Sequence, residues 1–250
     1  MQVETSLPIE VWSDIACPWC AIGKRHLEQA LTGFEHPVSV RWRSFQLDPH
    51  APAVQDGDYV ARLAAKYRTD PAQAQRMIDT MTDRAAAEGL TFRFDRIRPG
   101  NTFDAHRLLH LAADRGLQDA TKERFLTAYL GEGAAIGDHT VLRTLAREGG
   151  LDEDEVTEVL RGDTYADDVR ADVSQARAFG IGGVPFFVID RRYAIEGAQP
   201  AEVVLGALQR AWSERSPLQI VGATGAVAAG HDGRDGHDHG AACADGSCAV

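Results

Sequence analysis

Four cysteines are the residues of this 250-residue chain best suited to chemistry, and they occur as two pairs. Cys17 and Cys20 stand in the segment DIACPWCAIG, whereas Cys243 and Cys248 stand in CADGSC near the C-terminus. A Cys-x-x-Cys pair exchanges disulfides, provides half of a zinc site or is a structural pair. Zinc would need a second ligand pair, and none is apparent in the body of the sequence. The first pair is therefore interpreted as a redox pair.

The chemistry of the first pair depends on where a helix begins. Pro18 suits the first helical position, because its fixed φ fits and its missing N–H would lack an intrahelical partner. Cys17 then occupies the N-cap, where free N–H groups and the helix dipole lower the pKa of its thiol. Cys20 falls one turn later, on the face toward the core. We expect an exposed, low-pKa Cys17 that attacks disulfides and a shielded Cys20 that resolves the mixed disulfide, with positive potential from Lys24 and Arg25.

A second motif, GIGGVPFFVID, places Pro185 directly before an apolar strand. Proline within a sheet is normally confined to the first residue of a strand or to an edge. A trans proline that opens the strand is the ordinary interpretation, because only about 5% of X-Pro bonds are cis. If the Val184–Pro185 bond is cis, the backbone of Val184 can face the cysteine pair and bind an extended substrate.

The two motifs must be brought together by the elements between them. The chain alternates strand, helix and strand, passes through a long helical block, and ends with two strands and a helix. The predicted strands cover residues 9–12, 38–47, 184–190 and 191–197. Helices are predicted over 18–31 and 200–214, and a long helical region made of six separate segments is predicted over about 58–179. This order indicates one α/β unit interrupted by a helical insertion, and the Gly, Ala, Asp and His composition of residues 216–250 predicts a disordered tail.

Composition and charge restrict the function. The net charge of -11 argues against nucleic acid and anionic membranes, which attract clustered Lys and Arg. No stretch approaches the roughly 18 apolar residues of a membrane span. The segment MQVETSLPIEVWSD has neither the basic nor the apolar region of a signal peptide. We therefore expect a cytoplasmic protein, in which a cysteine pair is more often catalytic, redox-sensing or metal-binding than structural.

Three segments carry a resemblance to a known family. VWSDIACPWCAIGKRHLEQAL, NTFDAHRLLHLA and GIGGVPFFVIDRRYAIEGAQP resemble the FrnE-like branch of the DsbA family, over about residues 8–212. The resemblance implies an α/β fold: a thioredoxin-like domain of residues 1–50 and 180–215, interrupted by an α-helical insertion of residues 51–179. It also implies a cytoplasmic thiol–disulfide oxidoreductase or isomerase that acts on protein thiols and disulfides.

The same resemblance assigns roles to individual residues. Cys17 is the nucleophile, Cys20 the resolving thiol and Pro185 the cis-proline beside them. Independently of the resemblance, we expect Val184 and Trp19 to contact the substrate. It implies no cofactor other than the redox-active cysteines, with glutathione or thioredoxin as the electron partner. Because the cysteines enclose Pro-Trp and no imidazolium, we expect a milder oxidant than DsbA, mostly reduced in the cytosol.

Two other functions remain open. Glutathione-dependent isomerases and kappa-type glutathione transferases are similar in fold and insertion, but they carry Ser where Cys17 stands. A stress-related protein that binds unfolded clients or metal is the other alternative. NTFDAHRL does not discriminate, because Asn101 and Thr102 either cap the following helix, which we favour, or line the cleft. Its apolar residues, Phe103, Ala105, Leu108 and Leu109, form a buried helical stripe in the simplest interpretation.

The second cysteine pair has three interpretations. Cys243 and Cys248 are an accessory redox pair, part of a metal site, or incidental. The metal site would also use His231, His237 and His239. Some FrnE-like proteins carry an additional Cys-x4-Cys pair near the C-terminus. CADGSC resembles that pattern, which favours the redox role. The 27 residues between Arg215 and Cys243 span roughly 26–31 Å as a flexible coil, against a radius of gyration of about 18 Å for the body, so the pair can reach the first cysteines.

Overall fold

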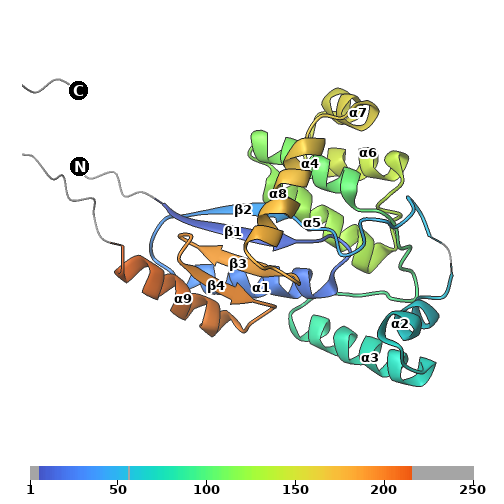
Figure 1. Ribbon diagram of the computed structural model, residues 1–250, viewed down its shortest axis with the longest axis horizontal. Helices are drawn as coiled ribbons and strands as arrows, with labels where there is room; N and C mark the ends of the chain where they lie inside the picture. Colours follow the sequence, from blue (N-terminus) through green and yellow to red (C-terminus); the bar gives the residue numbers. More distant parts are fainter. Residues whose placement is uncertain (1–5, 56, 216–250) are drawn as a thin grey trace, which may run out of the picture. The chain divides into compact units, whose positions relative to one another are not determined.

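The computed structural model describes residues 6–55 and 57–215 (Figure 1). Within these residues the strands form one sheet in the order β2–β1–β3–β4. β1 runs parallel to β2 and antiparallel to β3, and β3 pairs antiparallel with β4. The strands are β1 (Leu7–Ser13), β2 (Val38–Ser44), β3 (Phe186–Ile189) and β4 (Tyr193–Glu196). The sheet therefore joins two segments far apart in the sequence, and the predicted α/β order is confirmed.

Most of the described chain between β2 and β3 is helical. Four of these helices begin at an aspartate whose carboxylate accepts hydrogen bonds from the first turn, namely Asp58, Asp70, Asp138 and Asp152. The α-helices are α1 (Pro18–Thr32), α2 (Tyr59–Tyr67), α3 (Pro71–Ala87), α4 (Phe103–Asp114), α5 (Gln118–Thr127), α6 (His139–Glu148), α7 (Glu153–Arg161), α8 (Ala166–Ala178) and α9 (Ala201–Ser213), with a π-helical turn η1 (Ala128–Glu132) after α5. None of the described helices is long and apolar enough to cross a membrane.

The segment 88–102 is not helical, and it separates two of the helical segments predicted within residues 58–179. Phe92, Phe94 and Ile97 are buried in the core of the helical region, so they hold this segment against the core. The N–H of Arg93 donates a hydrogen bond to the carbonyl of Leu130 at 2.7 Å. These contacts replace the hydrogen bonds that a helix would have made.

β1 is buried on both faces of the sheet. Leu7, Ile9 and Val11 point to the face covered by α1 and α9. Trp12 points to the opposite face, where its indole N–H donates to the backbone carbonyl of Asp172 on α8 at 3.0 Å. Figure 1 shows α8 across one face of the sheet and α1 and α9 across the other. A strand covered on both faces is held rigidly, and α1 follows it after four residues.

The start of α1 lies where the sheet meets the helical region. Ile15 and Ile22 belong to the same hydrophobic cluster as Leu108 on α4 and Phe125 on α5. The sequence between β1 and α1 is thus packed against helices that come from the middle of the chain. The division of the chain at residues 50 and 180 remains a prediction.

Candidate active site

The two cysteines of the CPWC segment occupy the first turn of α1. Cys17 is the N-cap, and Pro18 stands at the first helical position, as predicted. The N–H of Cys17 donates to the carbonyl of Asp14 at 3.3 Å, and the N–H of Cys20 donates to the carbonyl of Cys17 at 3.0 Å. These bonds close the turn that holds both sulfur atoms at the N-terminal end of the helix.

The loop before β3 lies opposite this turn. The Val184–Pro185 peptide bond is cis, and the thiol of Cys17 donates a hydrogen bond to the carbonyl oxygen of Val184 at 3.4 Å. The ring of Pro185 packs on α1 at Gly23, where an added Cβ would stand only 2.8 Å from the proline Cγ. The fold therefore brings Cys17 and Val184 together although 167 residues separate them.

Cys17 is buried, which corrects the exposed position expected from the sequence. Its side chain is 4% exposed and that of Cys20 is 0% exposed, because the Val184 loop covers the N-terminus of α1. Cys17 instead lines a cavity of about 510 Å³, the Cys17 cavity, which α2 and α3 form together with the turn. The apolar part of its wall comes from Tyr59, Leu63, Met77, Ile78, Met81 and Phe94.

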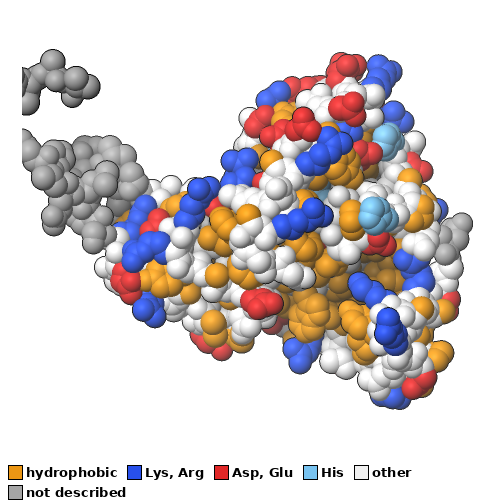
Figure 2. Space-filling view, viewed as in Figure 1, with side chains coloured by type: hydrophobic (Ala, Val, Ile, Leu, Met, Phe, Trp, Pro, Cys, Tyr) orange, Lys and Arg blue, Asp and Glu red, His pale blue; other side chains and the backbone are white. Residues whose placement is uncertain are grey.

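Figure 2 shows orange hydrophobic side chains in the hollow between the α2–α3 pair and the rest of the molecule, with Lys and Arg at its edge. Lys66 and Arg76 line the Cys17 cavity. Lys66 lies over the ring of Tyr67, and Arg76 donates to the amide oxygen of Gln73 at 2.6 Å. Neither pairs with a carboxylate among the described residues, so this cavity offers apolar contacts next to uncompensated positive charge.

The two thiols have opposite pKa shifts. A hydrogen bond from the Cys20 thiol lowers the pKa of Cys17, helped by the backbone N–H groups of Cys20 and Trp19, although burial and the charge of Asp14 oppose this. Burial raises the pKa of Cys20 well above its ordinary value. The low pKa predicted for Cys17 thus agrees with the structure, but its largest cause is the second thiol.

A buried carboxylate lies behind the turn. Asp14 is 1% exposed, and its carboxylate accepts hydrogen bonds from the N–H of Leu47 at 2.8 Å and from the imidazole of His106 at 3.4 Å. Burial alone would raise the pKa of Asp14, but these bonds hold it below the ordinary value. Burial also lowers the pKa of His106, so a neutral imidazole faces an ionised carboxylate.

The amino-acid sequence matches a known protein family. The family model of the DSBA-like thioredoxin domain matches residues 8–209. The chain belongs to this family. It is a thiol–disulfide oxidoreductase with a thioredoxin-like fold, which confirms the predicted fold and enzyme class.

Individual relatives agree with the family match. The probable DsbA oxidoreductase SCO1869 from Streptomyces coelicolor is 46% identical, with a TM-score of 0.81 over 87% of this chain and 94% of that chain. The uncharacterized protein YwbO of Bacillus subtilis is 30% identical over 183 residues, which are 72% of this chain and 86% of the relative. The cytosolic disulfide reductase DsbM from Pseudomonas aeruginosa, 19% identical with a TM-score of 0.55 over 83% of this chain and 96% of that chain, shows the fold alone.

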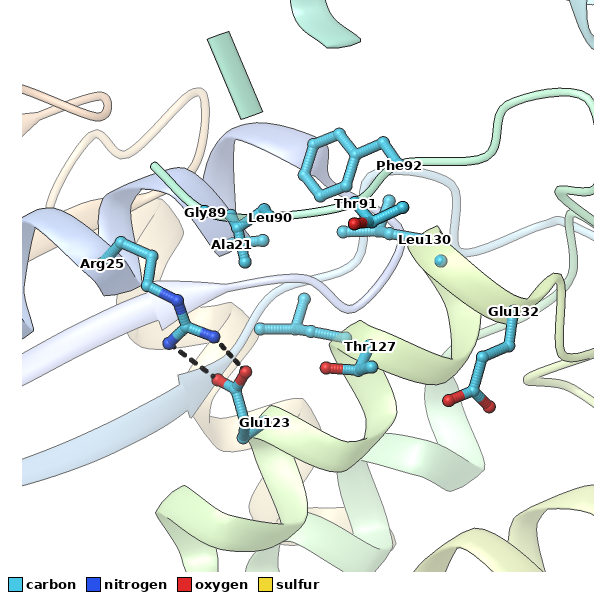
Figure 3. Close-up of a pocket in the computed structure, with 12 residues that line it drawn as sticks. Ala21, Arg25, Gly89, Leu90, Thr91, Phe92, Glu123, Thr127, Leu130 and Glu132 are labelled. Atoms are coloured by element: carbon cyan, nitrogen blue, oxygen red, sulfur yellow. Dashed lines mark hydrogen bonds and ion pairs between the residues drawn. The ribbon is translucent and has the colours of Figure 1, made fainter. Parts of the chain in front are cut away.

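Lys24 and Arg25 of this DsbA-like chain do not provide the free positive potential expected of them. Lys24 lies 3.1 Å from both Asp119 and Glu123 on α5, and Arg25 lies 3.1 Å from Glu123. Figure 3 shows Arg25 of α1 facing Glu123 at one end of a second pocket, of about 340 Å³, that contains neither cysteine. The carboxylates of α5, together with Glu28 of α1, neutralise both cations, so the pair joins two helices instead of polarising the site.

The remaining predicted residues divide between the site and the scaffold of the DsbA-like domain. Trp19 is 36% exposed beside Cys17, with the guanidinium of Arg84 5.3 Å above its ring. Asn101 caps α4 as favoured, because its side-chain oxygen accepts the N–H of Phe103 at 2.8 Å. Thr102 occupies the N-cap position without a side-chain cap bond, and its hydroxyl bonds to Asp14 instead, which corrects the capping role favoured for Thr102.

The stripe predicted in NTFDAHRL is buried at Ala105, Leu108 and Leu109, whereas Phe103 is only partly buried under Arg170. Among the described residues, no group of three His, Cys, Asp or Glu side chains is placed to hold a metal ion. The predictions for the tail lie outside the described residues, namely those for Cys243, Cys248, His231, His237 and His239.

The sequence interpretation missed three buried polar residues of this DsbA-like site: Asp14, His106 and Lys122. The available signal was a polar residue on an otherwise apolar helix face, as at His106 in HRLLHLA. Such a pattern does not show which residues lie near the buried polar side chain, because Asp14 precedes α1 and Lys122 lies on α5, in other elements of the fold than His106.

Proposed function

We propose that this DsbA-family enzyme is a FrnE-like cytoplasmic oxidoreductase or isomerase of protein disulfides, in which Cys17 attacks and Cys20 resolves. One observation carries the proposal: a low-pKa thiol at a helix N-terminus opens into a cavity, with a fully buried, high-pKa thiol one turn behind it. The thiolate is the attacking species in disulfide exchange, so this asymmetry sets the order of the two thiols.

In the reducing direction, the Cys17 thiolate attacks one sulfur of the substrate disulfide. A new S–S bond forms, the substrate bond breaks, and the second substrate sulfur leaves as a thiolate and is protonated. Cys20 then loses its proton and attacks the Cys17 sulfur. The Cys17–Cys20 disulfide forms, the first substrate sulfur leaves, and the substrate has gained two electrons. Isomerisation uses the first step and its reversal at a different substrate sulfur.

Val184, Pro185 and Trp19 are proposed to position the substrate. The Val184 carbonyl lies within hydrogen-bond distance of the Cys17 sulfur, so an extended peptide running past the thiol would lie along this backbone. The partly exposed indole of Trp19 lies between the Cys17 cavity and a separate groove, which Pro185 also lines. A peptide whose cysteine sits at Cys17 would place its neighbouring side chains on either side of Trp19.

Glutathione or thioredoxin is proposed as the electron partner. Lys66 and Arg76 line the Cys17 cavity, and they match the carboxylates of glutathione. In a cytosol poised near about -220 to -320 mV, a pair milder than DsbA would be mostly reduced, which favours reductase or isomerase activity.

An insulin-reduction assay with glutathione as reductant tests the proposed function. Cys17→Ser removes the nucleophile, so turnover should fall by about 10²-fold or more, as for the loss of an activated nucleophile. Cys20→Ser should instead accumulate a mixed disulfide, which mass spectrometry can detect. Gln29→Ser, an exposed change on the same helix, serves as the control and should retain turnover. Wild-type turnover by Cys17→Ser would rule out the proposed mechanism.

A further inference from the structure

Lys122 on α5 is a buried base without a hydrogen-bond partner. Its side chain is 0% exposed, and its Nζ and the Oγ of Ser13 are the buried side-chain atoms without a partner in the described chain. An unpartnered ammonium is costly in a protein interior, whereas a neutral amine is tolerated far better. The surroundings of Lys122 therefore favour its neutral amine.

The residue type is informative because this chain uses arginine almost everywhere else. Of its 26 lysines and arginines, only Lys24, Lys66 and Lys122 are lysines. Arginine stays protonated in proteins, whereas a buried lysine can lose and regain its proton near neutral pH. The side chain at position 122 is therefore a base that can exchange a proton, as an arginine at this position could not.

Lys122 on α5 and Cys20 on α1 lie close enough to interact electrostatically, and their helices are joined directly. Cys20 and Lys24 are four residues apart on one face of α1, and Asp119 and Lys122 are three apart on one face of α5. The ion pair of Lys24 with Asp119, at 3.1 Å, joins the two faces. Lys122 also lies 5.7 Å above the ring of Trp42, which closes the β2 side. The charged and titratable groups that act on it are Cys17, Cys20, Asp14, Lys24 and His106.

We propose that Lys122 accepts the proton of Cys20 when Cys20 resolves the mixed disulfide. This rests on the proposed function of the cysteine pair. The neutral amine takes the thiol proton, which leaves an ammonium beside the Cys20 thiolate. The thiolate attacks the Cys17 sulfur, the Cys17–Cys20 bond forms, and the substrate sulfur leaves as a thiolate. The ammonium then returns its proton to solvent or to the leaving thiolate.

The other groups near Cys20 are poorer acceptors for this proton. Asp14 is held ionised by hydrogen bonds that lower its pKa, which makes it a weak base. His106 is neutral, but its imidazole is directed at Asp14. Burial lowers the pKa of Lys122 and raises the pKa of Cys20, so both groups are favoured in their neutral forms before the proton moves. Among the charges around Lys122, that of Cys20 most favours its protonated form.

The test separates the two thiol steps in time. The full chain carries Cys243→Ser and Cys248→Ser and reacts with an aromatic disulfide that releases one coloured thionitrobenzoate per step. Attack by Cys17 gives the first release, and attack by Cys20 on the resulting mixed disulfide gives the second. Lys122→Met should leave the first rate within about twofold and slow the second by about 10²-fold at neutral pH, at the low end of general-base effects. The difference should shrink as the pH rises, because hydroxide can then remove the proton.

Two further measurements separate this role from a structural one. Lys122→Met should keep or raise the thermal midpoint, because it removes an unpartnered buried amine, whereas a structural lysine would lower it. Ser13→Ala removes the other unpartnered buried atom and should change neither release rate. If Lys122→Met does not fold, Lys122→Gln has a similar length and cannot accept the proton, and the same slow second release is expected.

An unchanged second release, with the pH profile of the parent chain, would overturn the assignment of Lys122. That result would leave the proposed function intact, because the parent chain would still show both releases. If the parent chain itself shows no release from Cys17, the proposed function fails before Lys122 is tested. The first release thus reports on the site, and the second reports on the proton acceptor.

Discussion

Cys17 and Cys20 stand three residues apart, yet their surroundings shift the pKa of the two thiols in opposite directions. Cys17 receives hydrogen bonds from the Cys20 thiol and from N–H groups of the first helical turn. Cys20 is enclosed on all sides, and burial disfavours its charge. The helix start that the sequence predicts contributes to the difference in pKa between the two thiols. The largest cause of the low pKa of Cys17 is the hydrogen bond between them.

This origin of the low pKa gives a prediction at the residue scale. The rate of Cys17 alkylation by iodoacetamide should rise with pH through a midpoint below the ordinary thiol value of 9.0. Cys20→Ala removes the largest cause and should raise this midpoint, whereas Cys20→Ser keeps a hydrogen-bond donor and should raise it less. Because folding lowers this pKa, the stability it adds to the reduced protein is complete above about pH 9 and is lost as the pH falls through the folded-state pKa.

Mass spectrometry of each alkylated cysteine gives these midpoints separately. Cys20 should remain unmodified in the native protein at neutral pH, because its thiol is buried and protonated. Equal alkylation of the two cysteines, or a Cys17 midpoint unaffected by Cys20→Ala, would contradict the assigned cause.

At the scale of elements, α1 and the loop before β3 must approach closely for the site to exist. Gly23 permits this contact, since an added Cβ would meet the ring of Pro185 at 2.8 Å and the ring of Phe187 at 3.4 Å. The proline ring has little freedom to move aside. The distance between Cys17 and the Val184 backbone is therefore set by a residue one turn beyond the cysteine pair.

Gly23→Ala tests this dependence. The added methyl group should push the loop away from α1 and destabilise the protein by about 1–3 kcal/mol, as overpacking does. It should also slow disulfide exchange more than tenfold, since the Val184 carbonyl leaves Cys17. Urea unfolding and the insulin assay measure the two effects. Gly206→Ala on α9 is the matched control: its Cβ meets nothing within 4 Å, so the helix should gain about 0.5–1 kcal/mol. Equal behaviour of the two variants would refute the packing argument.

The elements themselves were largely predictable because their signals are local. Pro18 after Cys17, the aspartate caps and the apolar strands each depend on a few neighbouring residues. The burial of Cys17 and the pairing of Asp14 with His106 were not predictable, since each joins segments far apart in the chain. Lys24 and Arg25 show the same limit: their charges were visible, but the carboxylates of α5 that neutralise them were not.

At the scale of the whole molecule, the chain combines an acidic DsbA-like domain with a second cysteine pair that lies outside the described residues. Exchange between the two pairs would be intramolecular, and joining two reactive groups in one chain raises their effective concentration, up to the millimolar range. In such a reaction the Cys243–Cys248 dithiol would reduce the Cys17–Cys20 disulfide, and glutathione would then reduce the tail disulfide that results. The accessory redox role of Cys243 and Cys248 therefore predicts an effect on turnover rather than on stability.

Replacing Cys243 and Cys248 with serine should leave the thermal midpoint and the Cys17 alkylation rate unchanged. Insulin turnover should fall by about tenfold when glutathione is limiting, because electrons no longer reach the first pair through the second. In Cys20→Ser, mass spectrometry should find a disulfide between Cys17 and Cys243 or Cys248. The metal alternative is tested by His231→Ala, His237→Ala and His239→Ala together, which should not affect turnover. Two results together would show that the tail binds metal and that the accessory redox role is wrong. The first is a loss of turnover in the triple histidine variant. The second is a loss of turnover in the double Cys243/Cys248 variant only when zinc is supplied.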